Sequence, residues 1–167
     1  MRIRPEHATD IAAVRTVNLA AFDTRVEADL VEALREQASP IVSLVAEDVT
    51  GVVGHILFSP VTLDGPPRPG FMGLAPMAVL PARQRQGVGA SLVREGLERC
   101  RQIGAGAVVV LGHADYYPRF GFVPASRFGL RCQYGVPDEA FMALELLPGA
   151  FAGRSGTVRY HPAFPSV

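Results

Sequence analysis

The chain lacks several features that would place it in a specialised class of protein. It has no tryptophan, only two cysteines, and no excess of charge, because 16 basic side chains balance 16 acidic ones. Balanced charge gives no general attraction to nucleic acid or to an anionic membrane surface. Cys100 and Cys132 have no histidine at metal-ligand spacing. We therefore predict two reduced thiols that pack as small hydrophobic residues.

Long hydrophobic runs are also missing. The longest apolar stretches, such as AVVVL, are far shorter than the roughly 20 residues that a membrane-spanning helix needs. The first ten residues, MRIRPEHATD, lack the apolar segment of a signal peptide. These absences exclude a membrane protein, a basic nucleic-acid binder and a disulfide scaffold, and they predict a cytoplasmic location.

The chain does have enough apolar sequence for one folded core. Its 167 residues are 49% hydrophobic, and a domain usually has about 100–200 residues. We expect a single domain over residues 1–167, with a core over 1–147 and a C-terminal tail, 148–167, packed on that core.

Hydrophobic periodicity predicts alternating helices and strands. Helical spacing occurs at 11–21, 27–37 and 87–103, and a short Pro-interrupted helix is expected at 115–120. Strand patterns occur at 2–4, 43–47, 52–63, 74–80, 107–111, 122–124, 141–146 and 157–160. Residues 64–70 form a Pro/Gly-rich loop. This order predicts an α/β or α+β fold with a central mixed sheet flanked by helices.

The most informative segment is the strand–loop–helix unit LAPMAVLPARQRQGVGASL, residues 74–92. Its helix opens at Gln84-x-x-Gly87-x-Gly89. The start of a helix has unpaired main-chain N–H groups and partial positive charge, and glycines let a phosphate approach the backbone closely. The pattern therefore indicates a pyrophosphate site, with a plain glycine-rich turn as the alternative.

Neighbouring residues narrow the choice of phosphate motif. Arg83 and Arg85 add positive charge to the loop, which has no lysine. A P-loop needs the sequence Gly-Lys-Ser/Thr, which the loop lacks. A dinucleotide-binding fingerprint needs a third small residue at the position of Leu92. Both motifs are therefore excluded. Pro76 lies in the preceding strand and cannot donate a ladder hydrogen bond. That strand can therefore diverge from its neighbour, although an ordinary edge-strand proline would look the same.

The segment resembles the acetyl-CoA motif of the GCN5-related N-acetyltransferase (GNAT) family. The resemblance implies a central mixed sheet with two splayed strands, and acetyl-CoA as co-substrate without a metal. Main-chain N–H groups over 84–90 would hold the pyrophosphate, and the pantetheine arm would pair with the backbone of Met77 and Val79. The implied cofactor-binding residues are Met77, Ala78, Val79, Gln84, Arg85, Gln86, Gly87, Val88, Gly89 and Ala90.

A second motif supports the same family. Tyr117 lies four residues before Gly121-Phe122, as in the second half of the family pattern. The doubled tyrosine and the tail segments VPDEAFMALEL and GTVRYHPAF resemble the YhbS-like branch of the family. A phenol stays protonated at neutral pH, so the resemblance implies that Tyr117 is the general acid for the departing sulfur. We expect Tyr116 to pack, and a structural Tyr117 is the alternative.

The implied function is transfer of an acetyl group from acetyl-CoA to a primary amine, by direct attack in a ternary complex. The acceptor would be a small molecule or a peptide, with neither nucleic acid nor membrane as a partner, and a homodimer is left open. The main-chain N–H of Val79 would donate to the oxyanion. A non-catalytic acyl-CoA sensor or partner-binding domain is the alternative class, and it would not need Tyr117.

The base that removes the amine's proton stays open. The strand 74–79 has no carboxylate. The candidates are Glu27, Glu47, His55, His113, Glu145 and a water molecule. Of these candidate bases we prefer His113, because it follows the AVVVL strand beside the predicted cleft.

Overall fold

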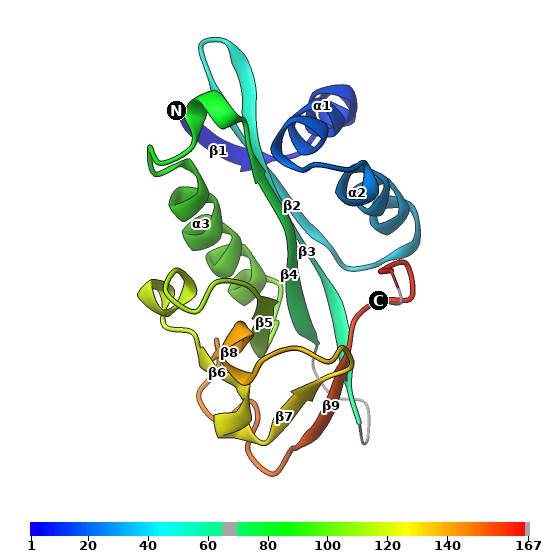
Figure 1. Cartoon of the computed structure of the whole chain (residues 1–167), viewed down its shortest axis with the longest axis vertical. Coiled ribbons are helices and arrows are strands. Elements are labelled where there is room, and N and C mark those ends of the chain that lie inside the picture. Colours follow the sequence, from blue (N-terminus) through cyan, green and yellow to red (C-terminus); the bar gives the residue numbers. More distant parts are fainter. Residues whose placement is uncertain (65–69, 166–167) are drawn as a thin grey trace.

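The computed structural model describes residues 1–64 and 70–165. Most of the predicted Pro/Gly-rich loop, 65–69, lies outside the described residues. Long strands cross the molecule diagonally, with two helices on one side and the third on the other (Figure 1). Within the described part, the α-helices are α1 (Ile11–Ala21), α2 (Val26–Gln37) and α3 (Val88–Gln102). These bounds confirm the three predicted α-helices.

The strands also follow the predicted order. They are β1 (Arg2–Pro5), β2 (Val42–Asp48), β3 (Gly51–Leu63), β4 (Phe71–Val79), β5 (Ala107–Leu111), β6 (Val123–Pro124), β7 (Leu130–Cys132), β8 (Phe141–Glu145) and β9 (Gly156–Arg159). Over the described residues the main order is β1-β2-β3-β4-β5-β8-β6, and β9 joins the end of β3 and pairs with β7. The β4–β5 and β7–β9 pairs are parallel, so the predicted mixed sheet is confirmed.

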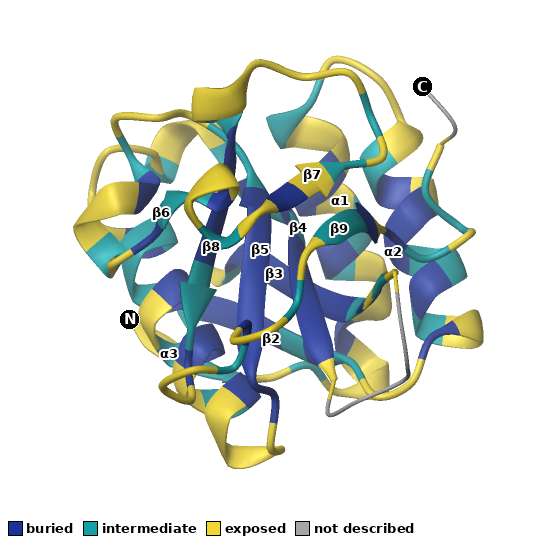
Figure 2. Ribbon diagram, turned by 90° about the horizontal axis from the view of Figure 1, so that it is seen from below, coloured by how far each residue is buried: buried dark blue, intermediate teal, exposed yellow. Residues whose placement is uncertain are grey.

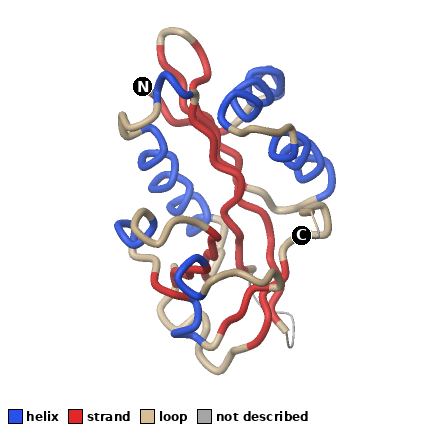
Figure 3. The backbone as a smooth tube through the Cα atoms, in the orientation of Figure 1, coloured by secondary structure: helices blue, strands red, loops and turns tan. Residues whose placement is uncertain are grey.

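The pairing between β4 and β5 covers only the first part of β4. It runs from Phe71 opposite Ala107 to Leu74 opposite Val110. Beyond that point β4 stays paired with β3 alone, up to Val79. Figure 3 shows β4 continuing toward the start of α3 while β5 ends in the lower half of the molecule. The predicted divergence of these two strands around Pro76 is confirmed.

Helix α3 covers one face of the sheet because small residues let it approach closely. A Cβ at Gly96 would lie 2.2 Å from the ring of Phe58, and one at Gly54 would lie 3.0 Å from the side chain of Val88. The buried face of α3 includes Leu92 and Leu97. In Figure 2 the central strands are dark blue between exposed helix surfaces, so the sheet forms the middle of the core.

Helices α1 and α2 pack on the opposite face. The predicted stripe of α2 is buried, and Leu34 packs in one cluster with Val45 and Leu57. In α1, Val14 and Val17 are buried as expected, whereas Ile11 is 38% exposed. One residue at the start of a helix can face solvent without changing the helical spacing of the others.

The side chain of Asp10, the residue before α1, makes no capping hydrogen bond to this helix; it accepts from the His7 N–H at 2.7 Å and from Arg4 at 2.7 Å. Two local predictions need correction. The predicted helix at 115–120 is a short 3-10 helix over Tyr117–Phe120. Strand β7 was missed, since three residues carry too little periodicity to detect. Cys100 is buried as predicted.

Candidate active site

A cavity of about 600 Å³ lies where β4 leaves β5. Four segments surround it: the end of α1, the end of β4, the loop into α3, and the start of the 3-10 helix after β5. The lining residues are Ala21, Phe22, Met77, Ala78, Val79, Arg83, Gln84, Arg85, Gly87, Gly89, Ala90, Tyr116 and Arg119. The predicted motif therefore surrounds a real cavity.

The start of α3 presents main-chain N–H groups to this cavity. Gly87 adopts a left-handed conformation with φ of 85° directly before the helix. The N–H of Ser91 bonds to the carbonyl of Gly87 at 3.1 Å. The N–H groups of residues 88–90 precede that first helical bond, and helix geometry leaves them free to bind an anion.

The end of β4 offers a second set of main-chain groups. The N–H of Leu80 bonds to the carbonyl of Val53 on β3 at 2.9 Å. Main-chain groups of successive strand residues point to opposite sides, so those of Val79 and Met77 point away from β3. The side-chain amide of Gln84 donates to the Val79 carbonyl at 3.0 Å. Gln84 of the motif is thus bonded to the edge of β4, close to the start of α3.

The three arginines that line the cavity differ in their contacts and backbone conformation. Arg83 is tied by an ion pair to Asp48 at 2.9 Å. Arg119 lies 4.4 Å from the ring centroid of Tyr116 and donates to the Tyr116 carbonyl. Arg85 has a φ of 62°, which is uncommon for a residue other than glycine. Positive charge therefore surrounds the helix start on several sides.

Eight of the ten predicted cofactor residues line the cavity, and two side chains do not. The amide of Gln86 donates to the carbonyl of Ala82 at 3.2 Å. Val88 is buried against the core. Because a helix start binds phosphate through its backbone, only the main chain of these two residues can act in the predicted way.

The two tyrosines take different positions. Tyr116 lines the cavity, and a Cβ at Gly89 would lie 3.2 Å from its hydroxyl. Tyr117 is 8% exposed, and its ring covers Gly112 just beyond β5. The two rings meet edge to face, with centroids 5.1 Å apart. Tyr116 therefore lines the cavity, whereas Tyr117 is not among the lining residues.

Burial affects the acidity of Tyr117. It raises the pKa of this phenol to about 12, with a smaller contribution from Tyr116. Tyr117 is thus fully protonated at neutral pH and can donate a hydrogen bond or a proton.

Most candidate bases already have structural partners or lie outside the cavity. Glu47 pairs with Arg4, and Glu145 accepts from a main-chain N–H at 2.9 Å. His113 is exposed and does not line the cavity. Glu27, in the first turn of α2, has one buried carboxylate oxygen without a partner among the described residues.

His55 belongs to a buried hydrogen-bonded chain. Its Nε2 lies 2.9 Å from the hydroxyl of Ser43, which donates to Glu6 at 2.9 Å, and Arg35 pairs with the other carboxylate oxygen at 2.6 Å. Since the carboxylate accepts the Ser43 proton, Nε2 of His55 carries a hydrogen and Nδ1 does not. Burial, together with Arg35, lowers the pKa of His55 to about 4, against the opposing effect of Glu6.

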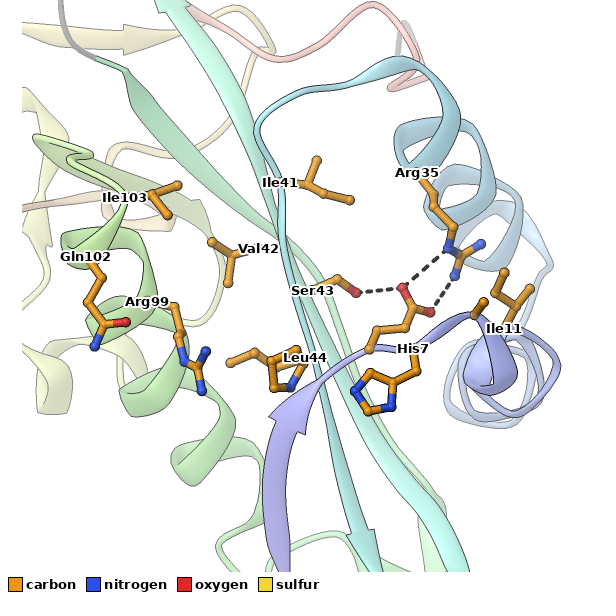
Figure 4. Close-up of a pocket in the computed structure, with 13 residues that line it drawn as sticks. His7, Ile11, Arg35, Ile41, Val42, Ser43, Leu44, Arg99, Gln102 and Ile103 are labelled. Atoms are coloured by element: carbon orange, nitrogen blue, oxygen red, sulfur yellow. Dashed lines mark hydrogen bonds and ion pairs between the residues drawn. The ribbon is translucent and has the colours of Figure 1, made fainter.

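This chain of groups borders a separate groove of about 530 Å³ (Figure 4). The groove runs beside β2, with Arg99, Gln102 and Ile103 of α3 on one side and Arg35 of α2 on the other. None of the predicted cofactor residues lines it. His55 therefore holds β3, β2 and α2 together through Ser43 and Glu6.

Within residues 1–64 and 70–165, no helix is both long and apolar enough to cross a membrane. Across the same residues, no three acidic, histidine or cysteine side chains gather as metal ligands.

Comparison with known proteins assigns the family. Residues 11–122 match the model of the acetyltransferase (GNAT) family. The chain is 38% identical to YhbS of Escherichia coli strain K12, called an uncharacterized N-acetyltransferase, over 98% of each chain. It is 44% identical to the similarly described YjhQ of the same strain, over 78% of this chain and 75% of that protein. The chain therefore belongs to the GNAT acetyltransferase family and is an N-acetyltransferase.

Solved structures agree with this assignment. The crystal structure of E. coli YhbS in complex with CoA has a TM-score of 0.91 and 37% identity, covering 98% of this chain and 91% of that one. A GNAT family acetyltransferase from Brucella melitensis in complex with acetyl-CoA has a TM-score of 0.80 and 39% identity, covering 98% and 97%. The predicted GNAT fold and the resemblance to the YhbS-like branch are confirmed.

Proposed function

We propose that this protein transfers an acetyl group from acetyl-CoA to a primary amine by direct attack in a ternary complex. The main support for this proposal is that the start of α3, with its free main-chain N–H groups, and the outward-facing edge of β4 line the same cavity. The N–H groups of residues 88–90 bind the pyrophosphate, while Met77 and Val79 pair with the amides of the pantetheine arm. The CoA and acetyl-CoA complexes of related proteins support this arrangement.

The space between α3 and β4 is narrow at Gly89. A Cβ at this position would lie 3.2 Å from the Tyr116 hydroxyl and 3.4 Å from Cε of Met77. A larger side chain would fill the space between α3 and β4. Glycine keeps this space open, so a phosphate can approach the helix start directly.

The chemistry needs an oxyanion donor and an acid. As the amine attacks, a C–N bond forms, the C–S bond breaks, and negative charge passes through the carbonyl oxygen to sulfur. The outward-facing N–H of Val79 donates to the oxyanion. Tyr117 donates its proton to sulfur and is later reprotonated by solvent. Tyr116 is the second candidate acid, favoured by its place in the cavity wall.

The proton released by the amine needs an acceptor. Glu27 follows the segment Ala21–Phe22, which lines the cavity, and has a buried carboxylate oxygen without a partner in the described chain. Such an oxygen is poorly solvated and gains a hydrogen bond by accepting a proton. We assign the base to Glu27, with His113 as the competing candidate from the sequence.

The test is CoA release, measured with a thiol reagent, from acetyl-CoA and a panel of primary amines. We expect release that requires both substrates and gives the N-acetyl product by mass spectrometry. Tight acetyl-CoA binding without product from any amine would instead identify an acyl-CoA sensor.

A further inference from the structure

A second cavity, of about 510 Å³, borders the C-terminal end of β5. Leu111, the last residue of β5, lines it, and the next residue is Gly112, which the ring of Tyr117 covers. A Cβ at Gly112 would lie 2.2 Å from that ring, so the contact is tight. This cavity and the proposed acid therefore adjoin the same strand end.

The wall of this cavity is uncharged, and two of its described residues, Tyr134 and Phe164, are aromatic. Its described lining residues are Leu111, Gln133, Tyr134, Gly135, Val136, Phe164 and Pro165. None of these seven carries a charged side chain. The amide oxygen of Gln133 already accepts the Tyr160 N–H, and the Tyr134 hydroxyl donates to the Pro165 carbonyl at 3.0 Å. The polar groups of the wall are thus partly engaged before any ligand arrives.

Aromatic packing makes this wall rigid. The ring of Tyr160 stacks on that of Tyr134, with centroids 6.0 Å apart, and lies 5.0 Å from that of Phe164. The hydroxyl of Tyr160 is buried without a partner among the described residues. Burial raises the pKa of Tyr160, and Cys132, Tyr134 and Tyr117 add to this effect.

The uncharged wall and its aromatic rings favour one class of acceptor amine. A polycation needs carboxylates to replace its lost hydration, and the described wall has none. The cavity at the start of α3 is lined by Arg85 and Arg119 as well as the paired Arg83, and these charges repel additional positive charge. An aromatic or apolar body gains from burial against the rings, and an ammonium group is attracted to their faces.

We propose that the cavity lined by Leu111, Tyr134, Val136 and Phe164 holds the acceptor, and that this acceptor is a primary amine on an aromatic or apolar body without a second charge. The inference rests on the proposed transferase function and adds a substrate class to it. Polyamines, aminosugars and lysine-rich peptides fall outside this class.

Binding is tested with tryptamine. The protein has no tryptophan, so the indole emission of tryptamine reports its own binding without background. Protein saturated with CoA is titrated into tryptamine, and we expect a saturable change in emission. Val136, at the mouth of the cavity, is 36% exposed, so Val136→Arg should fold normally. The added cation should weaken tryptamine binding by about tenfold or more.

The control is Val49→Arg, at the fully exposed turn between β2 and β3, which should bind tryptamine like the unmodified protein. Tyr134→Ala removes one ring of the wall and should also weaken binding. Absence of tryptamine binding, or equal binding by Val136→Arg and Val49→Arg, would overturn the proposal.

Turnover separates this inference from the transferase function. We expect tryptamine and phenethylamine to have a higher kcat/KM than spermidine or kanamycin. A higher kcat/KM for the polycations would overturn the substrate class and leave the transferase function standing. Binding of tryptamine that Val136→Arg weakens, without acetylation of any amine, would support the cavity assignment and contradict the transferase function.

Discussion

Arg83 donates from Nε to Oδ2 of Asp48 at 2.9 Å, which ties the loop before α3 to the turn between β2 and β3. Asp48 also accepts from the N–H of Thr50 at 2.8 Å and from its hydroxyl. Together with Arg83, these bonds hold the pKa of Asp48 well below its usual value. The loop that carries the proposed anion site is thus anchored by residues some 35 positions earlier.

Loss of this anchor should loosen the anion site. We expect Asp48→Asn to weaken CoA binding by about three- to tenfold, because a more mobile loop pays more ordering entropy on binding. Isothermal calorimetry measures the change. Glu36→Gln, an exposed charge on α2, is the control and should bind normally. Unchanged affinity in Asp48→Asn would show that the loop holds its shape without the ion pair.

Gly89→Val should weaken CoA binding by more than about tenfold, since a branched side chain would occupy the space between Tyr116 and Met77. Calorimetry with circular dichroism separates binding from folding. Gly70→Val is the matched control, because a Cβ at Gly70 meets no atom of the described residues within 4 Å. Full affinity in a folded Gly89→Val variant would remove this glycine from the phosphate site.

Tyr117→Phe removes only the hydroxyl, so CoA binding should change little while kcat falls by roughly 10²–10⁴. Tyr116→Phe is the internal control and should retain most of kcat. The reverse result would assign the acid to Tyr116, which lines the cavity. Full turnover in both variants would mean that the departing sulfur needs no side-chain acid.

Glu27→Gln keeps the size of the side chain but cannot accept the amine's proton. We expect kcat to fall by about 10²-fold or more, with recovery as the pH rises and more free amine is present. Glu32→Gln, on the same helix and paired with Arg15 at the surface, is the matched control. A loss in His113→Ala together with normal turnover in Glu27→Gln would assign the base to His113.

The lowered pKa of His55, about 4, predicts how stability depends on pH. The unfolded chain takes up a proton on this residue near pH 6.5, whereas the folded chain does not until about pH 4. The free energy of unfolding should therefore fall by up to about 1.4 kcal/mol per pH unit as the pH drops through this window. Urea unfolding at several pH values measures it.

NMR provides the direct check on His55. Its ring signals in the folded protein should stay constant from neutral pH to about pH 5. A native titration near the ordinary value would contradict the buried chain of His55, Ser43 and Glu6. Ser43→Ala should cost about 1–3 kcal/mol of stability, since it leaves the buried Nε2 of His55 without its partner.

The sequence by itself determined the local elements and indicated the place of the proposed anion site. The 3.6-residue period of α3, the two-residue period of the strands and the spacing of Gly87 and Gly89 all depend on neighbouring residues. The parallel pairing of β4 and β5 also followed, because a strand–helix–strand unit forms a right-handed crossover. Sequence patterns carry such information within about twenty residues.

Only the tertiary structure decided which side chains meet. Tyr116 rather than Tyr117 lines the cavity, because the short 3-10 helix orients adjacent rings differently. Glu6 meets Ser43 across 37 positions of sequence, and Tyr160 backs an aromatic wall that begins at Tyr134. Such contacts arise from the crossing of distant segments, where packing and burial select one arrangement among many that the local pattern allows.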